Sequence, residues 1–194
     1  MEHFKGMDSY EVQNKLKRFA EMVKQWNKTI NLTSLQSDVW KRHIQDSIQL
    51  LTYIDGKRIL DVGSGGGFPG MVLAIADPKR EWHLVESDTR KAVFLNEVRR
   101  KLEINCIIHH KRVEEILDTF DEVIARAFSS LERLIAISFI KLRPNGKGIF
   151  MKGKSLHQEI LRVEKKWRFS RTIFQNQTHT EGYIIQIKEI SQRI

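Results

Sequence analysis

The sequence has few residues that cross-link or interrupt a chain. Among 194 residues there are one cysteine and three prolines. A single cysteine, Cys106, excludes an intrachain disulfide and a cysteine-rich metal site, and it suits a reducing compartment. No apolar run approaches the roughly 20 residues of a membrane-spanning helix, and the N-terminal residues lack a signal-peptide apolar region. We therefore expect a cytoplasmic protein without a resident metal.

Acidic residues become scarce toward the C-terminus. The net charge is +9. Residues 1–140 hold 21 lysines and arginines against 20 acidic residues, whereas residues 141–194 hold 12 against 4. Such an uneven distribution indicates a surface that faces a polyanion, for example a nucleic acid. The alternative is a solvated basic face that has no partner.

The apolar pattern predicts one domain, with a helical extension over residues 1–55 and an α/β core over residues 56–194. The predicted strands are 58–62, 82–86, 105–109, 122–125, 148–152, 171–174 and 183–188. The predicted helices of the core include 89–102, 131–142 and 156–167. This alternation favours a seven-stranded, mostly parallel sheet with helices on both faces. Only a short turn region separates the last two strands, so we expect them to form a terminal antiparallel hairpin.

A glycine-rich block follows the first predicted strand. Residues 59–70 read Ile-Leu-Asp-Val-Gly-Ser-Gly-Gly-Gly-Phe-Pro-Gly. Glycine tolerates positive φ and lets the backbone approach a ligand closely. Pro69 suits the first turn of a helix, where a backbone N–H is not needed. The block therefore predicts a strand, a glycine turn and a helix, which together bind a cofactor that contains adenosine.

Two cofactor motifs compete for this block. Gly65, Gly67 and Gly70 fit the dinucleotide fingerprint, whereas a motif that starts at Gly63 resembles the acidic-x-Gly-x-Gly-x-Gly motif of S-adenosylmethionine (SAM)-dependent methyltransferases. A carboxylate at Glu86, at the end of the second strand, can accept both ribose hydroxyls in either case. The terminal hairpin favours the class I SAM-dependent methyltransferase fold, which is Rossmann-like, over a dinucleotide fold. We therefore predict SAM as the cofactor.

The segment after the fourth predicted strand bears on the methyl acceptor, because ligands lie outside the carboxyl ends of parallel strands. It contains neither the Pro-Pro-aromatic motif of amino-group methylation nor a cysteine for covalent attack on a pyrimidine. These absences favour an acceptor that needs neither a general base nor a protein nucleophile. Guanine N7 is such an acceptor, because it presents a lone pair and no proton, and its methylation is a direct displacement. We accordingly predict no catalytic base. In an A-form RNA duplex, N7 lies in a major groove that is too deep and narrow for side chains to enter. We therefore expect the target guanine to be unpaired or flipped out, and Phe128 can stack on it.

Several short motifs occur in a fixed order along the chain. They are Asn31-Leu32-Thr33, Arg42-His43-Ile44, Asp46-Ser47, the glycine block with Phe68-Pro69-Gly70, Arg90-Lys91, Phe94-Leu95, Arg112-Val113-Glu114-Glu115, Arg126-Ala127-Phe128, Ser130 and Lys152-Gly153. Together they resemble the RsmG (GidB) family of bacterial 16S ribosomal RNA guanine-N7 methyltransferases. The resemblance implies methyl transfer from SAM to one guanine in the 530 loop of 16S rRNA in the small ribosomal subunit.

Other functions stay open at this point. A SAM-dependent methyltransferase for a different RNA or for a small molecule would carry the same cofactor block. A SAM-binding or RNA-binding protein without catalysis would also lack a general base, and a nicotinamide oxidoreductase would share the glycines. We expect the protein to act as a monomer.

The cofactor-binding residues follow from two lines of reasoning. The resemblance places Gly63, Phe68, Val113, Glu114 and Arg126 at SAM-contacting positions, and the residue chemistry adds Gly65 and Glu86. Arg126 has further interpretations, since its guanidinium can orient the substrate, bind an RNA phosphate or form a structural salt bridge.

Basic residues and one aromatic residue are the candidates for RNA contact. The predicted helix 156–167 is expected to present phosphate-binding side chains. The full set of candidates is Arg42, Phe128, Lys152, Arg162, Lys165, Lys166 and Arg168. For Arg42 the alternative is that it forms, with His43 and Asp46, a polar clamp between the helical extension and the sheet.

Overall fold

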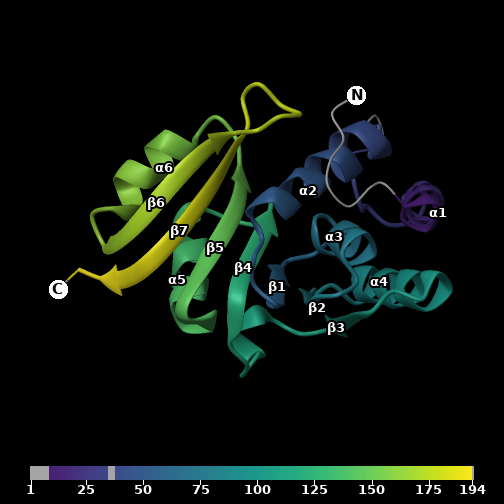
Figure 1. The fold of residues 1–194 in the computed structure, drawn as a ribbon, viewed down its shortest axis with the longest axis horizontal. Helices are drawn as coiled ribbons and strands as arrows, with labels where there is room; N and C mark the ends of the chain where they lie inside the picture. Colours follow the sequence, from purple (N-terminus) through teal and green to yellow (C-terminus); the bar gives the residue numbers. More distant parts are fainter. Residues whose placement is uncertain (1–8, 35–37, 194) are drawn as a thin grey trace.

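The protein folds around one seven-stranded sheet (Figure 1). The structure, a computed structural model, describes residues 9–34 and 38–193. The strands are β1 (Arg58–Val62), β2 (Glu81–Val85), β3 (Cys106–His109), β4 (Phe120–Arg126), β5 (Leu142–Lys152), β6 (Trp167–Gln175) and β7 (Tyr183–Gln192). Their order is β3-β2-β1-β4-β5-β7-β6; the first five are parallel, and β7 is antiparallel to both β5 and β6. The predicted sheet and its terminal hairpin are confirmed. We call the loop between β6 and β7, residues 176–182, the hairpin loop.

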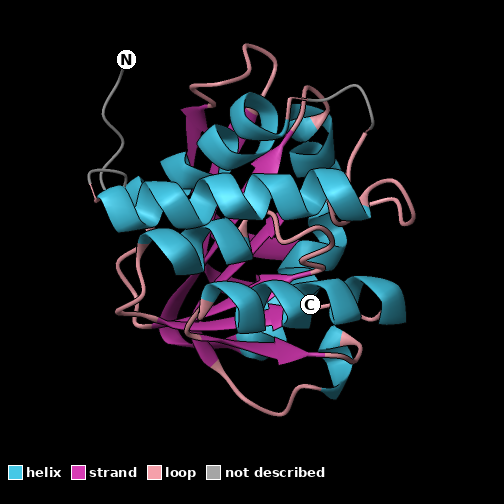
Figure 2. Ribbon diagram, turned by 90° about the vertical axis from the view of Figure 1, so that its right-hand side faces the viewer, coloured by secondary structure: helices cyan, strands magenta, loops and turns pink. Residues whose placement is uncertain are grey.

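Helices cover both faces of the sheet. Neighbouring residues of β1 point in opposite directions, so that Ile59 joins one apolar cluster and Leu60 the other. A strand buried on both faces carries a nearly continuous apolar run, as β1 does. One face is covered by α1 (Tyr10–Trp26), α3 (Gly70–Ala76) and α4 (Thr89–Leu102), and the other by α5 (Leu131–Lys141) and α6 (Leu156–Val163). Figure 2 shows helices stacked across the first of these faces.

The N-terminal extension packs against the core. Besides α1, it contains a π-helical turn η1 (Trp40–Gln45), the short α2 (Asp46–Ile48) and a 3₁₀ segment η2 (Gln49–Tyr53). In α1 the buried side chains face α3 and α4, and the ring of Phe19 lies 5.4 Å from that of Phe68 in the glycine block. The extension therefore reaches the predicted cofactor corner.

The end of α6 differs from the prediction. Helical periodicity continues through Leu156, Ile160, Val163 and Trp167, and this pattern predicted a helix as far as residue 167. In the structure α6 ends at Val163, and Trp167 is instead the first residue of β6, buried against the ring of Phe139. Lys165 and Lys166 therefore lie in a turn, and Arg168 lies in a strand. Among the described residues, no helix combines the length and apolar character needed to cross a membrane.

Candidate cofactor and acceptor site

The glycine turn after β1 is shaped by a neighbouring aromatic ring. Gly63 has φ +69° and Gly65 has φ +55°, conformations that favour glycine. A β-carbon on Gly63 would lie 2.0 Å from Cδ2 of Phe128. The absence of a side chain at Gly63 therefore allows both the turn and the close approach of Phe128, which extends from the segment after β4.

Asp61, the acidic residue of the glycine motif, holds the turn from beneath. Its carboxylate is fully buried, and Oδ2 accepts the backbone N–H of Gly70 at 3.0 Å, at the start of α3. Burial raises the pKa of Asp61 to about 7, and the nearby carboxylate of Glu86 adds to the rise. Asp61 is thus a structural residue. Pro69 precedes α3 rather than occupying its first turn as predicted.

Glu86 follows β2 and is fixed by the backbone around it. Oε2 accepts the N–H of Gly65 at 2.9 Å, and Oε1 accepts the N–H of Asp88 at 2.8 Å. The carboxylate is buried and lines a cavity. Each carboxylate oxygen has a second lone pair, so Glu86 retains the capacity to accept two ribose hydroxyls.

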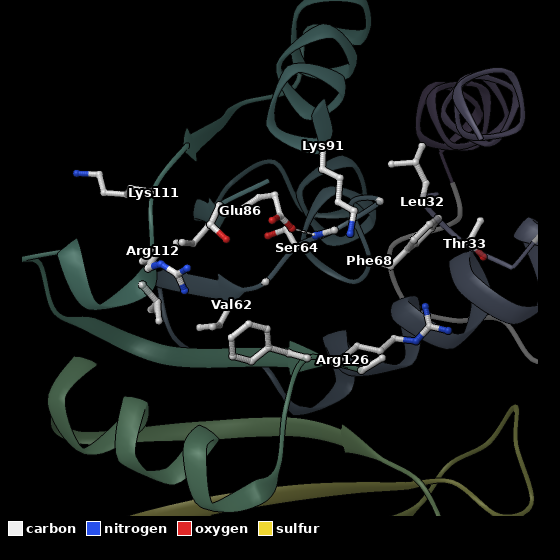
Figure 3. A pocket seen from close by; sticks show the side chains of 18 of the residues that line it. Leu32, Thr33, Val62, Ser64, Phe68, Glu86, Lys91, Lys111, Arg112 and Arg126 are labelled. Atoms are coloured by element: carbon white, nitrogen blue, oxygen red, sulfur yellow. Dashed lines mark hydrogen bonds between the residues drawn. The ribbon is translucent and has the colours of Figure 1, made fainter. Parts of the chain in front are cut away.

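We call the cavity beside Glu86 the cofactor cavity. It has a volume of about 540 Å³, which is typical of a small-molecule site. Figure 3 shows Arg112 at one end of it, and Phe68, Thr33 and Arg126 at the other. All seven predicted cofactor residues line it, namely Gly63, Gly65, Phe68, Glu86, Val113, Glu114 and Arg126. The structure thus brings together residues that are spread over 64 positions of the sequence, from 63 to 126.

One wall of the cavity comes from the N-terminal extension, and the sequence analysis did not assign it to the cofactor site. Leu32, Thr33 and His43 line the cavity. The side-chain oxygen of Asn27 accepts the N–H groups of Leu32 (2.8 Å) and Thr33 (3.0 Å), which fixes this loop. The motif Asn31-Leu32-Thr33 was the available signal, but its contact with the glycine block depends on tertiary packing.

His43 is held neutral at the edge of the cavity. Burial and, to a smaller extent, the positive charge of Arg126 lower the pKa of His43 to about 4. Its Nδ1 lies 2.9 Å from a guanidinium nitrogen of Arg126, which has no acceptor capacity, so Nδ1 accepts this bond and is unprotonated. The imidazole ring also packs on Phe68, with centroids 4.9 Å apart.

Arg126, the last residue of β4, joins the core to the extension. Its Nε lies 2.9 Å from Oδ2 of Asp46, and Nη2 donates to the backbone oxygen of Arg42 at 2.8 Å. These contacts match the polar clamp considered for Arg42, His43 and Asp46, although the side chain of Arg42 itself is exposed. Arg126 also faces the cavity, so its structural contacts leave it within reach of a ligand.

Two further cavities adjoin the first at Ala127. This residue has φ +51°, which is rare for a residue with a side chain, and it lines all three cavities. The smallest, of about 110 Å³, is lined by Phe128 and by an ion pair between Nζ of Lys152 and Oε2 of Glu159 at 2.8 Å. Lys152 also donates to the backbone oxygen of Ser129. Its ammonium group is therefore committed to contacts within the protein.

Four of the basic RNA-contact candidates lie at the opposite end of the sheet. Lys152, at the carboxyl end of β5, pairs with Tyr183 at the start of β7, whereas Trp167 pairs with Gln192 at the far end of β7 (Figure 1). Residues next to Trp167 are consequently remote from the cofactor cavity. The candidates placed at that end are Arg162, Lys165, Lys166 and Arg168.

The cavity has a basic rim of its own. Lys91, Lys111, Arg112 and Arg133 line it, and all four precede residue 141. The charge count concealed them, because acidic residues elsewhere in residues 1–140 balance their charge. In the ranges 9–34 and 38–193 no grouping of three or more His, Cys, Asp or Glu side chains suits a metal ion.

Comparison with known proteins decides the family. The family model for GidB, described as rRNA small subunit methyltransferase G, matches residues 12–187. The chain belongs to this family. Proteins named ribosomal RNA small subunit methyltransferase G are similar over 95% of the chain, with 39% identity in Granulibacter bethesdensis (88% of that protein) and 38% in Rickettsia massiliae (96% of that protein).

The fold of this GidB-family protein matches solved methyltransferases of low sequence identity. The O-methyltransferase TomG from Streptomyces achromogenes, in complex with SAM, aligns with a TM-score of 0.58 at 14% identity, over 89% of this chain and 88% of TomG. TYW2 from M. jannaschii, in complex with AdoMet, also gives 0.58, at 13% identity over 81% of this chain and 80% of TYW2. These likenesses confirm the predicted class I methyltransferase fold.

Proposed function

We propose that the protein transfers the methyl group of SAM to N7 of one guanine in the 530 loop of 16S rRNA. The observation that carries the proposal is the cavity lined by the glycine turn and Glu86, which meets a second cavity at Ala127. One cavity suits an adenosyl cofactor, and the junction supplies a place where an acceptor atom can approach it. Family membership supports the ribosomal substrate.

The residues around the larger cavity suit the parts of SAM. Glu86 would accept the ribose hydroxyls, and Val113 and Glu114, in the 3₁₀ segment η3 (Val113–Glu115) after β3, would flank the adenine. Gly63, Gly65 and Phe68 would contact the remainder of SAM, and Arg126 would pair with its carboxylate. SAM itself supplies a sulfonium methyl group, which makes the donor electrophilic.

The contribution of the protein to the reaction is positioning. Guanine N7 attacks through a lone pair and releases no proton, so the chain needs no general base. Holding donor and acceptor atoms about 3–3.5 Å apart and aligned can account for roughly 7–11 kcal/mol of the barrier. Phe128 is half-buried at the junction of the cavities, where its ring would stack on the flipped guanine.

The remaining parts of the proposal concern the substrate surface and the setting. Arg42 lines the second cavity beside the junction and would contact RNA there. Lys152 would support the site indirectly, through its ion pair with Glu159, rather than contact RNA itself. The distant basic side chains would touch a separate part of the large ribosomal substrate, and they are Arg162, Lys165, Lys166 and Arg168. The protein would act in the cytoplasm as a monomer that requires no metal.

Methyl transfer with labelled SAM tests the proposal. The substrates are small ribosomal subunits and free 16S rRNA, followed by mapping of the modified nucleotide. We expect label at N7 of one guanine in the 530 loop. Absence of label from every RNA would overturn the assignment, and label at a different nitrogen would overturn the mechanism.

A further inference from the structure

A second cavity of about 450 Å³ opens outside the carboxyl ends of β4 and β5. Arg126 and Ala127 line both this cavity and the cofactor cavity. Its other walls carry Arg42 from the extension, Lys154 after β5 and His179 from the hairpin loop. In Figure 1 the hairpin loop and α2 lie at the same edge of the sheet as the tips of β4 and β5.

The lining of this cavity is cationic. Arg42 and Lys154 are exposed, and no carboxylate of the described residues forms a salt bridge with either of them. Among the acidic lining residues, Asp46 is buried against Arg126, which leaves Glu181 as the exposed one. The lining is charged and polar rather than aromatic, so it suits phosphate groups better than stacked bases.

The hairpin loop is fixed in place by a buried polar network. Oδ1 of Asn176 accepts the N–H groups of Thr178 (2.8 Å) and His179 (2.9 Å). Its Nδ2 donates to Oδ1 of Asp46 at 2.9 Å, and the hydroxyl of Thr178 donates to the same oxygen at 2.6 Å. The other oxygen of Asp46 pairs with Arg126. One carboxylate thus sets the position of the loop relative to the cofactor cavity.

We propose that this cavity holds the single-stranded RNA next to the target guanine. Arg42, Lys154 and His179 contact the flanking phosphates, and the hairpin loop is the fixed wall that sets the position of the strand. Asn176 is a positioning residue that acts through this loop. The inference rests on the proposed function, because it assigns the second cavity to the same substrate.

Two double variants with equal charge loss test the phosphate contacts. Arg42→Ala with Lys154→Ala alters the cavity, and Lys57→Ala with Lys79→Ala, the remote variant, removes two exposed charges that precede β1 and β2 at the opposite edge of the sheet. Binding of a 16S fragment that contains the 530 loop is measured over a salt series with S-adenosylhomocysteine present. We expect the cavity variant to bind at least about tenfold more weakly, with a salt slope smaller by roughly 1–2, while the remote variant keeps the wild-type slope.

A second pair of variants tests the fixed wall. Asn176→Ala removes one of the two hydrogen bonds from the loop to Asp46 and the acceptor of the Thr178 and His179 N–H groups, whereas Gln177→Ala changes an exposed neighbour whose backbone N–H is bonded to Gln49. In steady-state methylation we expect Asn176→Ala to raise KM for RNA about tenfold, with kcat and SAM affinity near the wild-type values. Gln177→Ala should leave all three unchanged.

The outcomes separate this inference from the proposed function. If wild-type protein methylates rRNA but the cavity variants bind and react like wild type, the cavity assignment is overturned and the proposed function stands. Equal losses in the cavity and remote double variants would also overturn it, because they would indicate a general charge effect. If wild-type protein binds SAM but neither binds nor methylates rRNA, the proposed function fails, and this inference fails with it.

Discussion

Arg126 and Asp46 form an ion pair of 2.9 Å between the last residue of β4 and the N-terminal extension. The side chains are 17% and 4% exposed, so the pair is largely shielded from solvent. Removing one partner of a buried pair leaves the other charge without compensation, which costs about 3–5 kcal/mol. We expect Asp46→Ala to lower the free energy of unfolding by about 3 kcal/mol in urea denaturation.

A matched change at the surface serves as the control for this pair. Lys166 and Glu132 are 2.7 Å apart, but their side chains are 68% and 47% exposed. Exposed pairs contribute about 0–1 kcal/mol, so Glu132→Ala should change stability by less than about 1 kcal/mol. Similar losses in the two variants would show that Asp46 is not a buried anchor.

Gly63 and Phe128 offer a second test, because the ring occupies the space of a side chain. A β-carbon on Gly63 would lie 2.0 Å from Phe128, and φ of +69° adds backbone strain of about 1–3 kcal/mol. We expect Gly63→Ala to weaken SAM binding by at least about tenfold, a loss of about 1.4 kcal/mol measured by isothermal titration. Gly63→Ala should also lower the free energy of unfolding in urea denaturation. Adding Phe128→Ala should remove the clash and restore part of that free energy. No change in either measurement would contradict the close contact.

Local sequence motifs predicted residues that gather around one cavity, whereas the charge count selected basic residues that lie far from it. Glu86 and Gly63 stand at the ends of adjacent parallel strands, and the carboxyl ends of such strands meet at one edge of a sheet, so their spacing in sequence implies contact. The wall formed by His43 depends on packing of the extension against Phe68, which no local pattern encodes.

The C-terminal basic cluster shows why charge counts place residues poorly. A charge count shows which part of the sequence is basic, but not which end of the sheet its residues reach. Because β6 is antiparallel to β7, Arg168 lies at the end of the sheet remote from the site. The apolar pattern through Trp167 also fits both a helix and the first buried residue of a strand. Tertiary pairing with Gln192 decides between them.

Asp61 predicts a pH dependence of stability. Its pKa is 3.8 ordinarily and about 7 in the folded protein, so folding favours the protonated form. The stability that this group contributes is therefore fully present below about pH 4 and is lost as pH rises through about 7.

Asp61→Asn isolates this contribution, because the amide oxygen can still accept the N–H of Gly70 and the side chain does not titrate in this range. Relative to wild type, the variant should gain stability on the order of 2 kcal/mol between pH 5 and pH 8. Urea denaturation of both proteins at the two pH values measures the difference. Parallel pH profiles would show that the buried carboxyl does not titrate with a raised pKa.

Ala127 provides a final test, because it lies where the three cavities meet and its backbone is in the left-handed region. A left-handed conformation costs an L-residue about 1–2 kcal/mol, so Ala127→Gly removes strain but adds unfolded-state entropy of about 0.5–1 kcal/mol. The two effects nearly cancel, and we expect stability within about 1 kcal/mol of wild type.

Ala127→Val places a β-branched side chain at φ +51° and should lose about 1–3 kcal/mol of stability. It should also lose most methyl transfer, because the side chain fills the junction. Urea denaturation and kcat/KM for 16S rRNA measure the two effects, and wild-type behaviour of Ala127→Val would show that neither the strained backbone nor the open junction is needed.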